Sequence, residues 1–206
     1  FPTTTLFRST ANDAFSWNTT SALGGAGTLR IASGATFNIN AQGSRTINGL
    51  RIENLGTATS NMYGGGYALY LDNGAYFDNA GLFALGATGN NDQDAIATSA
   101  GSGTLRNTGT IRMDNGDGSF TLAPATFIND GGTLQASSGG ALLLSPADGQ
   151  YLNSVSFAGA NVRLSGGNHA FANGVTWAGQ VNHDGGAATF TAVSSAGVYN
   201  YNGGSL

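Results

Sequence analysis

The stretch FINDGGTLQASSGGALLL, residues 127–144, joins two short apolar runs through a glycine-rich break. Its opening pattern, an apolar residue followed by x-Asn-x-Gly, occurs four times in the middle of the chain: IENLGT (52–57), FDNAGL (77–82), LRNTGT (105–110) and FINDGG (127–132). The four asparagines, Asn54, Asn79, Asn107 and Asn129, are 25, 28 and 22 residues apart. Such intervals are typical of the structural repeats of solenoid proteins.

Short strands are expected along the whole chain. Runs of four to six residues rich in Leu, Ile, Val, Phe and Thr alternate with Gly, Asn, Asp and Ser, as in β-rich repeat proteins. The chain holds a single Glu and no Lys, so the strongest charged helix formers are almost missing. The pattern predicts an all-β chain, a single-stranded parallel β-helix (β-solenoid) of about eight coils with two or three short strands each. The handedness of the coil stays open.

The repeated Asn and Gly have an expected structural role. Glycine adopts the left-handed backbone conformation that a sharp corner requires. Asparagine tolerates the same conformation, and its side-chain amide bonds to neighbouring backbone. Stacked in register, the four asparagines are predicted to form an internal ladder in which each amide bonds to the next coil.

Composition excludes several classes of protein. Charged residues make up only 9% of the chain, the seven basic residues are all arginines, and the formal net charge is −4. Without a basic stripe, nucleic-acid binding is not expected. No apolar run approaches the roughly 20 residues that span a bilayer, so no membrane insertion of this segment is expected. Cysteine is absent, which excludes disulfides and thiolate metal sites.

The repeats FDNAGLFAL (77–85), LRNTGTIRM (105–113) and FINDGGTLQASSGGALLL (127–144) resemble those of secreted β-helical surface proteins of Gram-negative bacteria. These are the autotransporter passengers and filamentous-haemagglutinin-type adhesins. The resemblance implies a secreted or cell-surface location and a host or matrix glycan or protein as the partner. Residues 1–206 are interpreted as one solenoid domain from a larger secreted protein, with an N-terminal cap over residues 1–26, which fit no repeat well.

Catalysis and cofactors are not expected. Glycoside hydrolysis needs two carboxylates about 5 to 10 Å apart, and the candidates for such pairs are Asp78, Asp92, Asp94, Asp114, Asp117 and Asp130. Acids beside Gly and Asn are also what ordinary solvated turns contain. His169 and His183 match no tight metal-binding spacing. The run DNGDG (114–118) is rich in oxygen ligands but lacks the EF-hand series, so incidental calcium is left open.

Aromatic clustering gives the candidate binding site. Four tyrosines fall within residues 63–76. If Leu69, Leu71 and Phe77 face inward, strand alternation places four residues on the outside. We expect these four, Tyr70, Asp72, Tyr76 and Asp78, to form a sugar platform in which rings stack on the sugar and acids accept hydroxyls. The segment 86–103 is predicted to interrupt the coil rhythm beside that platform, where solenoid insertions often carry binding residues.

Three functions are therefore considered. The first is a non-catalytic extracellular adhesin or surface scaffold whose β-solenoid presents a glycan- or protein-binding face. The second is a polysaccharide-degrading β-helical hydrolase or lyase that uses acids of the set above. The third is a structural spacer without a ligand.

Overall fold

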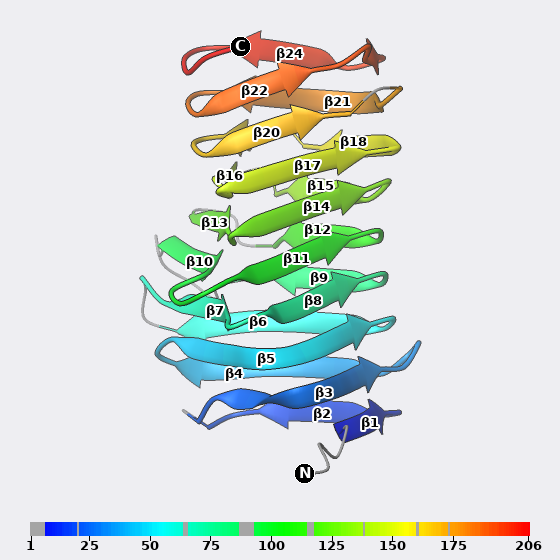
Figure 1. Ribbon diagram of the computed structural model, residues 1–206, viewed down its shortest axis with the longest axis vertical. Coiled ribbons are helices and arrows are strands. Elements are labelled where there is room, and N and C mark those ends of the chain that lie inside the picture. Colours follow the sequence, from blue (N-terminus) through cyan, green and yellow to red (C-terminus); the bar gives the residue numbers. More distant parts are fainter. Residues whose placement is uncertain are drawn as a thin grey trace, which may run out of the picture.

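The computed structural model describes residues 7–19, 21–63, 66–86, 93–114, 118–137, 139–159, 161–172 and 174–206. These residues form 24 β-strands, and every pairing between them is parallel. Between the first and last coils, strands pair with the equivalent strands one coil before and one coil after them, so the chain winds into a β-solenoid of about eight turns (Figure 1). The predicted all-β solenoid is confirmed. Within the described residues there is no helix long and apolar enough to cross a membrane.

Each coil has up to three walls. The front wall faces the viewer in Figure 1. Its strands are β1 (Phe7–Ala11), β3 (Leu23–Ile31), β5 (Arg45–Asn54), β8 (Ala75–Asn79), β11 (Gly103–Asn107), β14 (Thr126–Asp130), β17 (Asp148–Leu152), β20 (Asn168–Phe171) and β22 (Ala187–Phe190). The Asn-x-Gly motifs end β5, β8 and β11 and carry the chain to the back wall.

The back wall lies behind the front wall in the same view. Its strands are β2 (Ala14–Trp17), β4 (Thr36–Gln42), β6 (Thr57–Tyr63), β9 (Leu82–Leu85), β12 (Thr110–Met113), β15 (Thr133–Ala136), β18 (Ser154–Ala158), the first half of β21 (Thr176–His183) and β23 (Ser194–Ser195). Residues 1–6 and 20 of the expected N-terminal cap lie outside the described residues, and β1 and β2 pair directly with β3 and β4.

The side wall closes the coil. Its strands are β7 (Ala68–Asp72), β10 (Gln93–Ala97), β13 (Ser119–Ala123), β16 (Ala141–Leu144), β19 (Val162–Leu164), the end of β21 and β24 (Val198–Tyr201). The prediction that residues 86–103 interrupt the coil is wrong from residue 93 onward. There β10 pairs in register with β7 and β13 and continues the wall. Residues 87–92 lie outside the described part of the chain.

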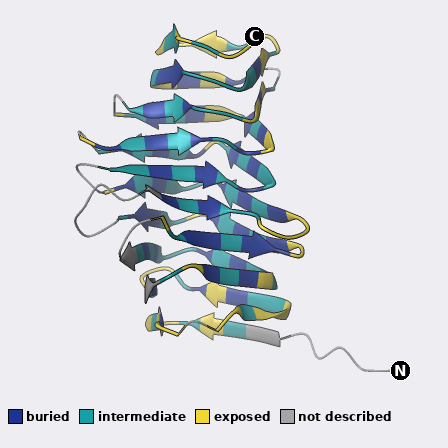
Figure 2. Ribbon diagram, turned by 90° about the vertical axis from the view of Figure 1, so that its left-hand side faces the viewer, coloured by how far each residue is buried: buried dark blue, intermediate teal, exposed yellow. Residues whose placement is uncertain are grey.

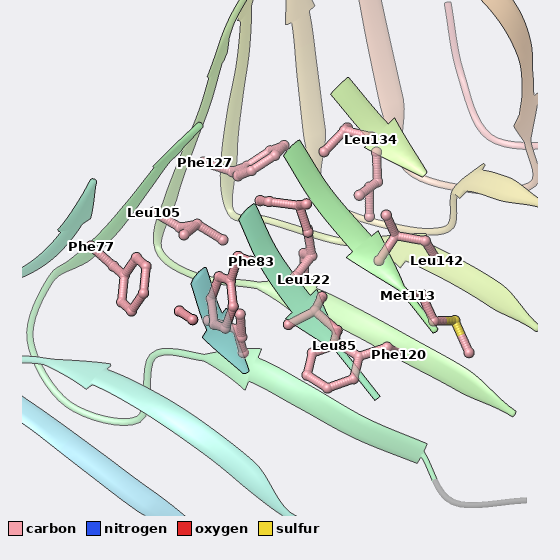
Figure 3. Packing of buried hydrophobic residues seen from close by; sticks show 14 of the residues in the cluster. Phe77, Phe83, Leu85, Leu105, Met113, Phe120, Leu122, Phe127, Leu134 and Leu142 are labelled. Atoms are coloured by element: carbon pink, nitrogen blue, oxygen red, sulfur yellow. The ribbon is translucent and has the colours of Figure 1, made fainter. Parts of the chain in front are cut away.

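Inward side chains from the three walls fill a narrow core. Figure 2 shows the buried residues along the strands, and exposed ones at many turns and in the first and last coils. Phe77 of the front wall stacks on Phe83 of the back wall with ring centroids 4.6 Å apart, and both rings are fully buried (Figure 3). Phe127 and Leu134 continue this pattern in a later coil, as their repeat predicts. Stacked rows of large apolar side chains thus supply the hydrophobic stabilisation that a single coil lacks.

The predicted asparagine ladder is present and fully buried. Asn54 Nδ2 donates to Asn79 Oδ1 (2.7 Å), Asn79 Nδ2 to Asn107 Oδ1 (2.8 Å), and Asn107 Nδ2 to Asn129 Oδ1 (2.7 Å). The second hydrogen of each amide has a backbone carbonyl near it, such as Leu82 O for Asn54 (2.9 Å). The amide nitrogens of Asn54, Asn79 and Asn107 therefore donate to the coil that follows, and the ladder ends where Asn129 donates to its own corner. At the other end of the ladder, Asn54 Oδ1 is buried and has no hydrogen-bond partner among the described residues.

The predicted left-handed glycine is found at the fourth motif, where Gly131 has φ of 74°, but the reason for glycine differs at the other three corners. Gly56, Gly81 and Gly109 are not in the left-handed region. A Cβ on Gly81 would lie 2.1 Å from Gly56 O, and one on Gly109 would lie 2.2 Å from Gly81 O. The corners stack so closely that only a residue without a side chain fits. The left-handed conformation is also used at the corner between β7 and β8, where Asn73 and Gly74 have φ of 53° and 83°.

An aromatic stack replaces the ladder in the last coils. Tyr151 occupies the register position after Asn129, and Phe171 and Phe190 follow it. The Tyr151 and Phe171 rings stack at 4.3 Å. His169 Nε2 donates to Gly166 O (2.9 Å), because a carbonyl can only accept, and His169 Nδ1 then accepts from the Tyr151 hydroxyl (2.9 Å). His169 is thus held as a buried, neutral imidazole.

We predict that the ladder contributes substantially to stability. Asn79→Ala removes the donor to Asn107 Oδ1 and leaves that oxygen buried without a side-chain partner. The free energy of unfolding should fall by about 3 kcal/mol in urea denaturation. The control is Asn48→Ala, which removes an exposed acceptor of Asn73 Nδ2 and should cost less than about 1 kcal/mol. Equal losses in both variants would contradict a stabilising ladder.

The buried His169 predicts acid sensitivity. Burial lowers the pKa of His169 from 6.5 to about 4. Between these values the unfolded chain binds a proton that the folded chain does not, so stability falls as the pH falls. The free energy of unfolding should drop by about 3 kcal/mol from pH 6.5 to pH 4 in urea titrations at several pH values. His169→Gln should lose most of this slope, and an unchanged slope in that variant would refute the assignment.

Candidate functional site

The outward side chains of the front wall form two rows, because each strand is in register with its neighbours. One row runs through Thr28, Arg51, Tyr76 and Thr104. The other runs through Thr10, Arg30, Glu53, Asp78 and Arg106. We call the surface that carries these two rows the outer front face. It concentrates arginines and acids of a chain that has few of either.

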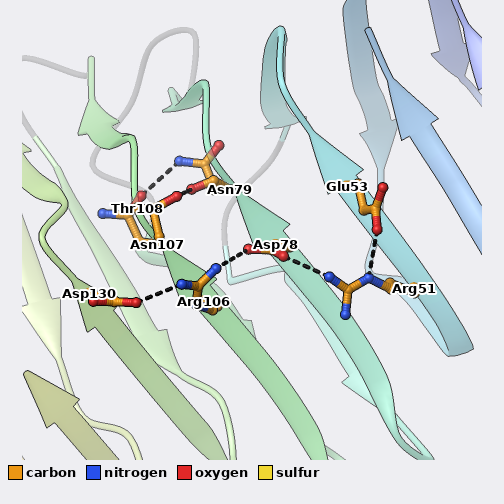
Figure 4. Close-up of polar contacts among 8 residues, drawn as sticks. All are labelled: Arg51, Glu53, Asp78, Asn79, Arg106, Asn107, Thr108 and Asp130. Carbon is orange, nitrogen blue, oxygen red and sulfur yellow. Dashed lines mark hydrogen bonds and ion pairs between the residues drawn. The ribbon is translucent and has the colours of Figure 1, made fainter. Parts of the chain in front are cut away.

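Ion pairs link five residues across this face, and we call them the charge chain (Glu53, Arg51, Asp78, Arg106 and Asp130). Arg51 Nε donates to Glu53 Oε1 (3.0 Å), and Arg51 Nη2 donates to Asp78 Oδ2 (2.7 Å). Arg106 Nη1 donates to Asp78 Oδ1 (3.2 Å), and Arg106 Nη2 donates to Asp130 Oδ2 (2.6 Å; Figure 4). Signs alternate from one end to the other, so each acid is neutralised by an arginine of its own or a neighbouring coil.

The charge chain shifts the titration of its members. The hydrogen bond from Arg106 is the largest cause that lowers the pKa of Asp130, and Asn153 lowers it further. The bond to Asp130 in turn raises the pKa of Arg106. Asp130 therefore remains an ionised acceptor well into acid.

Tyr76 packs against the charge chain. Its ring lies 4.7 Å from the guanidinium carbon of Arg51, within cation–π distance, and the residue is half-buried. Burial, followed by the charge of Asp78, raises the pKa of the Tyr76 hydroxyl. The phenol thus stays a neutral donor and acceptor at the edge of an array of charged hydrogen-bonding groups.

The four residues predicted for the sugar platform are not on one surface. Tyr76 and Asp78 lie on β8, on the outer front face. Tyr70 is half-buried on β7 in the side wall, in register with Thr46 and Ala97, beyond the corner at Asn73 and Gly74. The cluster in the sequence is therefore divided between two walls.

The expectation that Asp72 points outward is wrong, because it is only 5% exposed. Alternation fails at the end of β7, where the chain turns into the corner. Asp72 Oδ1 accepts from the amides of Ser99 (2.8 Å) and Ala100 (3.0 Å), and Oδ2 accepts from the Ser99 hydroxyl (2.7 Å). Burial raises the pKa of Asp72, but these hydrogen bonds outweigh it, and the net shift is downward. Asp72 positions the loop before β11.

The other candidate acids are dispersed. Asp94 is buried inside the side wall, where its Oδ1 accepts from the Tyr67 amide (3.3 Å). Asp114 pairs with Arg112 after the back-wall strand β12. Asp92 and Asp117 lie outside the described residues, so the incidental calcium left open at DNGDG (114–118) is not tested. Elsewhere in the described chain no group of three or more His, Cys, Asp or Glu could hold a metal ion.

The same face carries a polar hollow that the sequence analysis does not predict. It has a volume of about 330 Å³ and is lined by Ser9, Thr10, Thr28, Arg30 and Glu53. Part of this lining belongs to the segment interpreted as a cap. The sequence feature that indicates this hollow is the alternation in GTLRI (27–31). It places Thr28 and Arg30 on the side of the strand opposite the buried Leu29 and Ile31.

Comparison with protein-family models, with curated proteins and with solved structures finds no match for this chain.

We predict that Arg106 controls the ionisation of Asp130. Arg106→Gln removes the guanidinium, so the pKa of Asp130 should rise toward its ordinary value in an NMR carboxyl titration. Arg112→Gln removes an arginine of the back wall and should leave the pKa of Asp130 unchanged. Because Arg106 is partly exposed, its loss should cost less than about 1 kcal/mol of stability. An unmoved Asp130 pKa in Arg106→Gln would contradict the ion pair.

Proposed function

We propose that this β-solenoid is a non-catalytic extracellular adhesin or surface scaffold that binds glycans on its outer front face. The observation that carries the proposal is the charge chain with Tyr76 packed against it. The repeats that resemble Gram-negative surface adhesins support a secreted or cell-surface location. A host or matrix glycan is the favoured partner, and a protein partner is the alternative.

The chemistry of this face suits a hydroxyl-rich ligand. Guanidinium groups present pairs of donors, and the ionised carboxylates between them present acceptors, at intervals of about 4.8 Å from coil to coil. Neighbouring hydroxyls of a sugar ring act as both donors and acceptors. Because these groups hold one another in place, a sugar would meet a preorganised array and lose less entropy on binding. Tyr76 adds apolar ring surface beside it.

Polysaccharide hydrolysis or cleavage by a lyase is a second candidate, favoured by the two acids Asp78 and Asp130 that Arg106 joins on one face. A glycosidase needs one carboxylic acid that stays protonated near neutral pH. Arg106 holds the pKa of Asp130 below its ordinary value, which disfavours this role. The ionised Asp78 and Asp130 are therefore better suited to binding a saccharide than to hydrolysing it. Release of reducing or unsaturated ends from a bound polysaccharide would favour the enzyme instead.

Glycan binding is tested with two variants, at Tyr76 on the front wall and at Tyr70 on the side wall. On a glycan array, the wild-type protein should bind at least one class of saccharide. Tyr76→Ala should weaken that binding by at least fivefold, because it removes the ring from the outer front face. Tyr70→Ala, a change of the same size in the side wall, should alter binding by less than twofold. Absence of any glycan signal from the wild type would favour a protein partner or a spacer.

A further inference from the structure

The polar hollow lies at one end of the outer front face and shares Glu53 with the charge chain. Its volume of about 330 Å³ is at the lower end of the range for ligand pockets. Thr10 and Thr28 contribute hydroxyls, which both donate and accept hydrogen bonds. The hollow therefore offers one cation, one carboxylate and several hydroxyls to a ligand of modest size.

Arg30 differs from the other arginines of the outer surface. Arg51, Arg106, Arg112 and Arg163 each form an ion pair with an acid. Arg30 is exposed, and among the described residues it has no ion-pair partner. An exposed arginine without a carboxylate partner, inside a hollow, is available to an external anion.

Arg30 lies beside an acid with which it forms no ion pair. Glu53 is the direct register partner of Arg30 on the next strand. Its carboxylate turns instead to Arg51 Nε at 3.0 Å, and Arg51 also holds Asp78. Because Glu53 pairs with Arg51, the Arg30 guanidinium and the Glu53 carboxylate both line the hollow without forming an ion pair with each other.

We infer that this hollow binds the carboxylate-bearing sugar unit of an acidic polysaccharide. The planar guanidinium of Arg30 fits a carboxylate through two parallel hydrogen bonds. Glu53, Thr10 and Thr28 would bond to the ring hydroxyls of the same unit. The inference rests on the proposed glycan binding and specifies its ligand as a polyuronate.

The position of the hollow suits a polymer. The strands that carry Arg30 and Asp78 are two coils apart, a separation of about 10 Å along the stack. A saccharide bound at Arg30 would extend over Glu53 and Arg51 toward Tyr76 without leaving the outer front face. The charge chain and the hollow would then be successive parts of one binding surface.

The experiment uses the whole chain and two forms of one polymer. Isothermal titration calorimetry is carried out with polygalacturonate and with its fully methyl-esterified form, whose carboxylates are neutral. Wild-type protein should bind polygalacturonate at least tenfold more tightly than the ester. Arg30→Gln should weaken polygalacturonate binding at least tenfold and leave binding of the ester unchanged. Arg163→Gln removes an equal charge from the side wall and should change either affinity by less than twofold.

The outcomes separate this inference from the proposed function. Equal binding of polymer and ester, or equal losses in Arg30→Gln and Arg163→Gln, would overturn the inference. If Tyr76→Ala still weakens binding of a neutral glycan in that case, the proposed function stands. No binding of any saccharide by the wild type would overturn both. The wild type could instead bind a sulfated glycan more tightly than polygalacturonate and lose that binding in Arg30→Gln. That result would support an anion site at Arg30 but would overturn the assignment of a carboxylate sugar as its ligand.

Discussion

The fold depends on keeping every coil in register with the next, and the buried asparagines impose that register. Each interior amide of the ladder accepts from one coil and donates to the following one, at 2.7 to 2.8 Å. A shift of one residue would turn these side chains outward and put their charged neighbours into the core. Apolar rows such as Phe77, Leu105 and Phe127 favour stacking but tolerate more slip, because dispersion contacts have little direction.

The same register builds the outer front face. Three pairs of sequence neighbours point to opposite sides of their strands: Glu53 and Asn54, Asp78 and Asn79, and Arg106 and Asn107. Figure 4 shows the last two pairs. Once the asparagines stack inside, the charged residues must stack outside, within reach of one another. The charge chain is therefore a consequence of the ladder, and its geometry is as fixed as the core. A surface of this kind binds through preorganised groups on rigid strands rather than through mobile loops.

The sequence allowed the solenoid and its ladder to be predicted because both arise from a local motif that repeats. Contacts that depend on coil-to-coil register were harder to foresee. Arg51 meets Asp78 across 27 residues, and Arg106 meets Asp130 across 24, so neither pair forms a local pattern. Strand alternation misplaces Asp72, because the alternation fails where the chain turns into a corner. The apolar pattern does not reveal β10 either, because an acid, Asp94, occupies an inward position of that strand. Arg30 was overlooked because an unpaired cation is recognised only once its register partner, Glu53, is seen to bond elsewhere.

The most direct test of this account is NMR of the protein labelled with ¹⁵N at asparagine. We predict that the side-chain NH₂ signals of Asn54, Asn79 and Asn107 exchange slowly with solvent. They should also show nuclear Overhauser effects from each amide to the next one along the ladder, because those groups are buried and bonded in sequence. Side-chain amides that exchange as fast as exposed Asn48, with no contacts between successive asparagines, would contradict the in-register stack on which the outer front face depends.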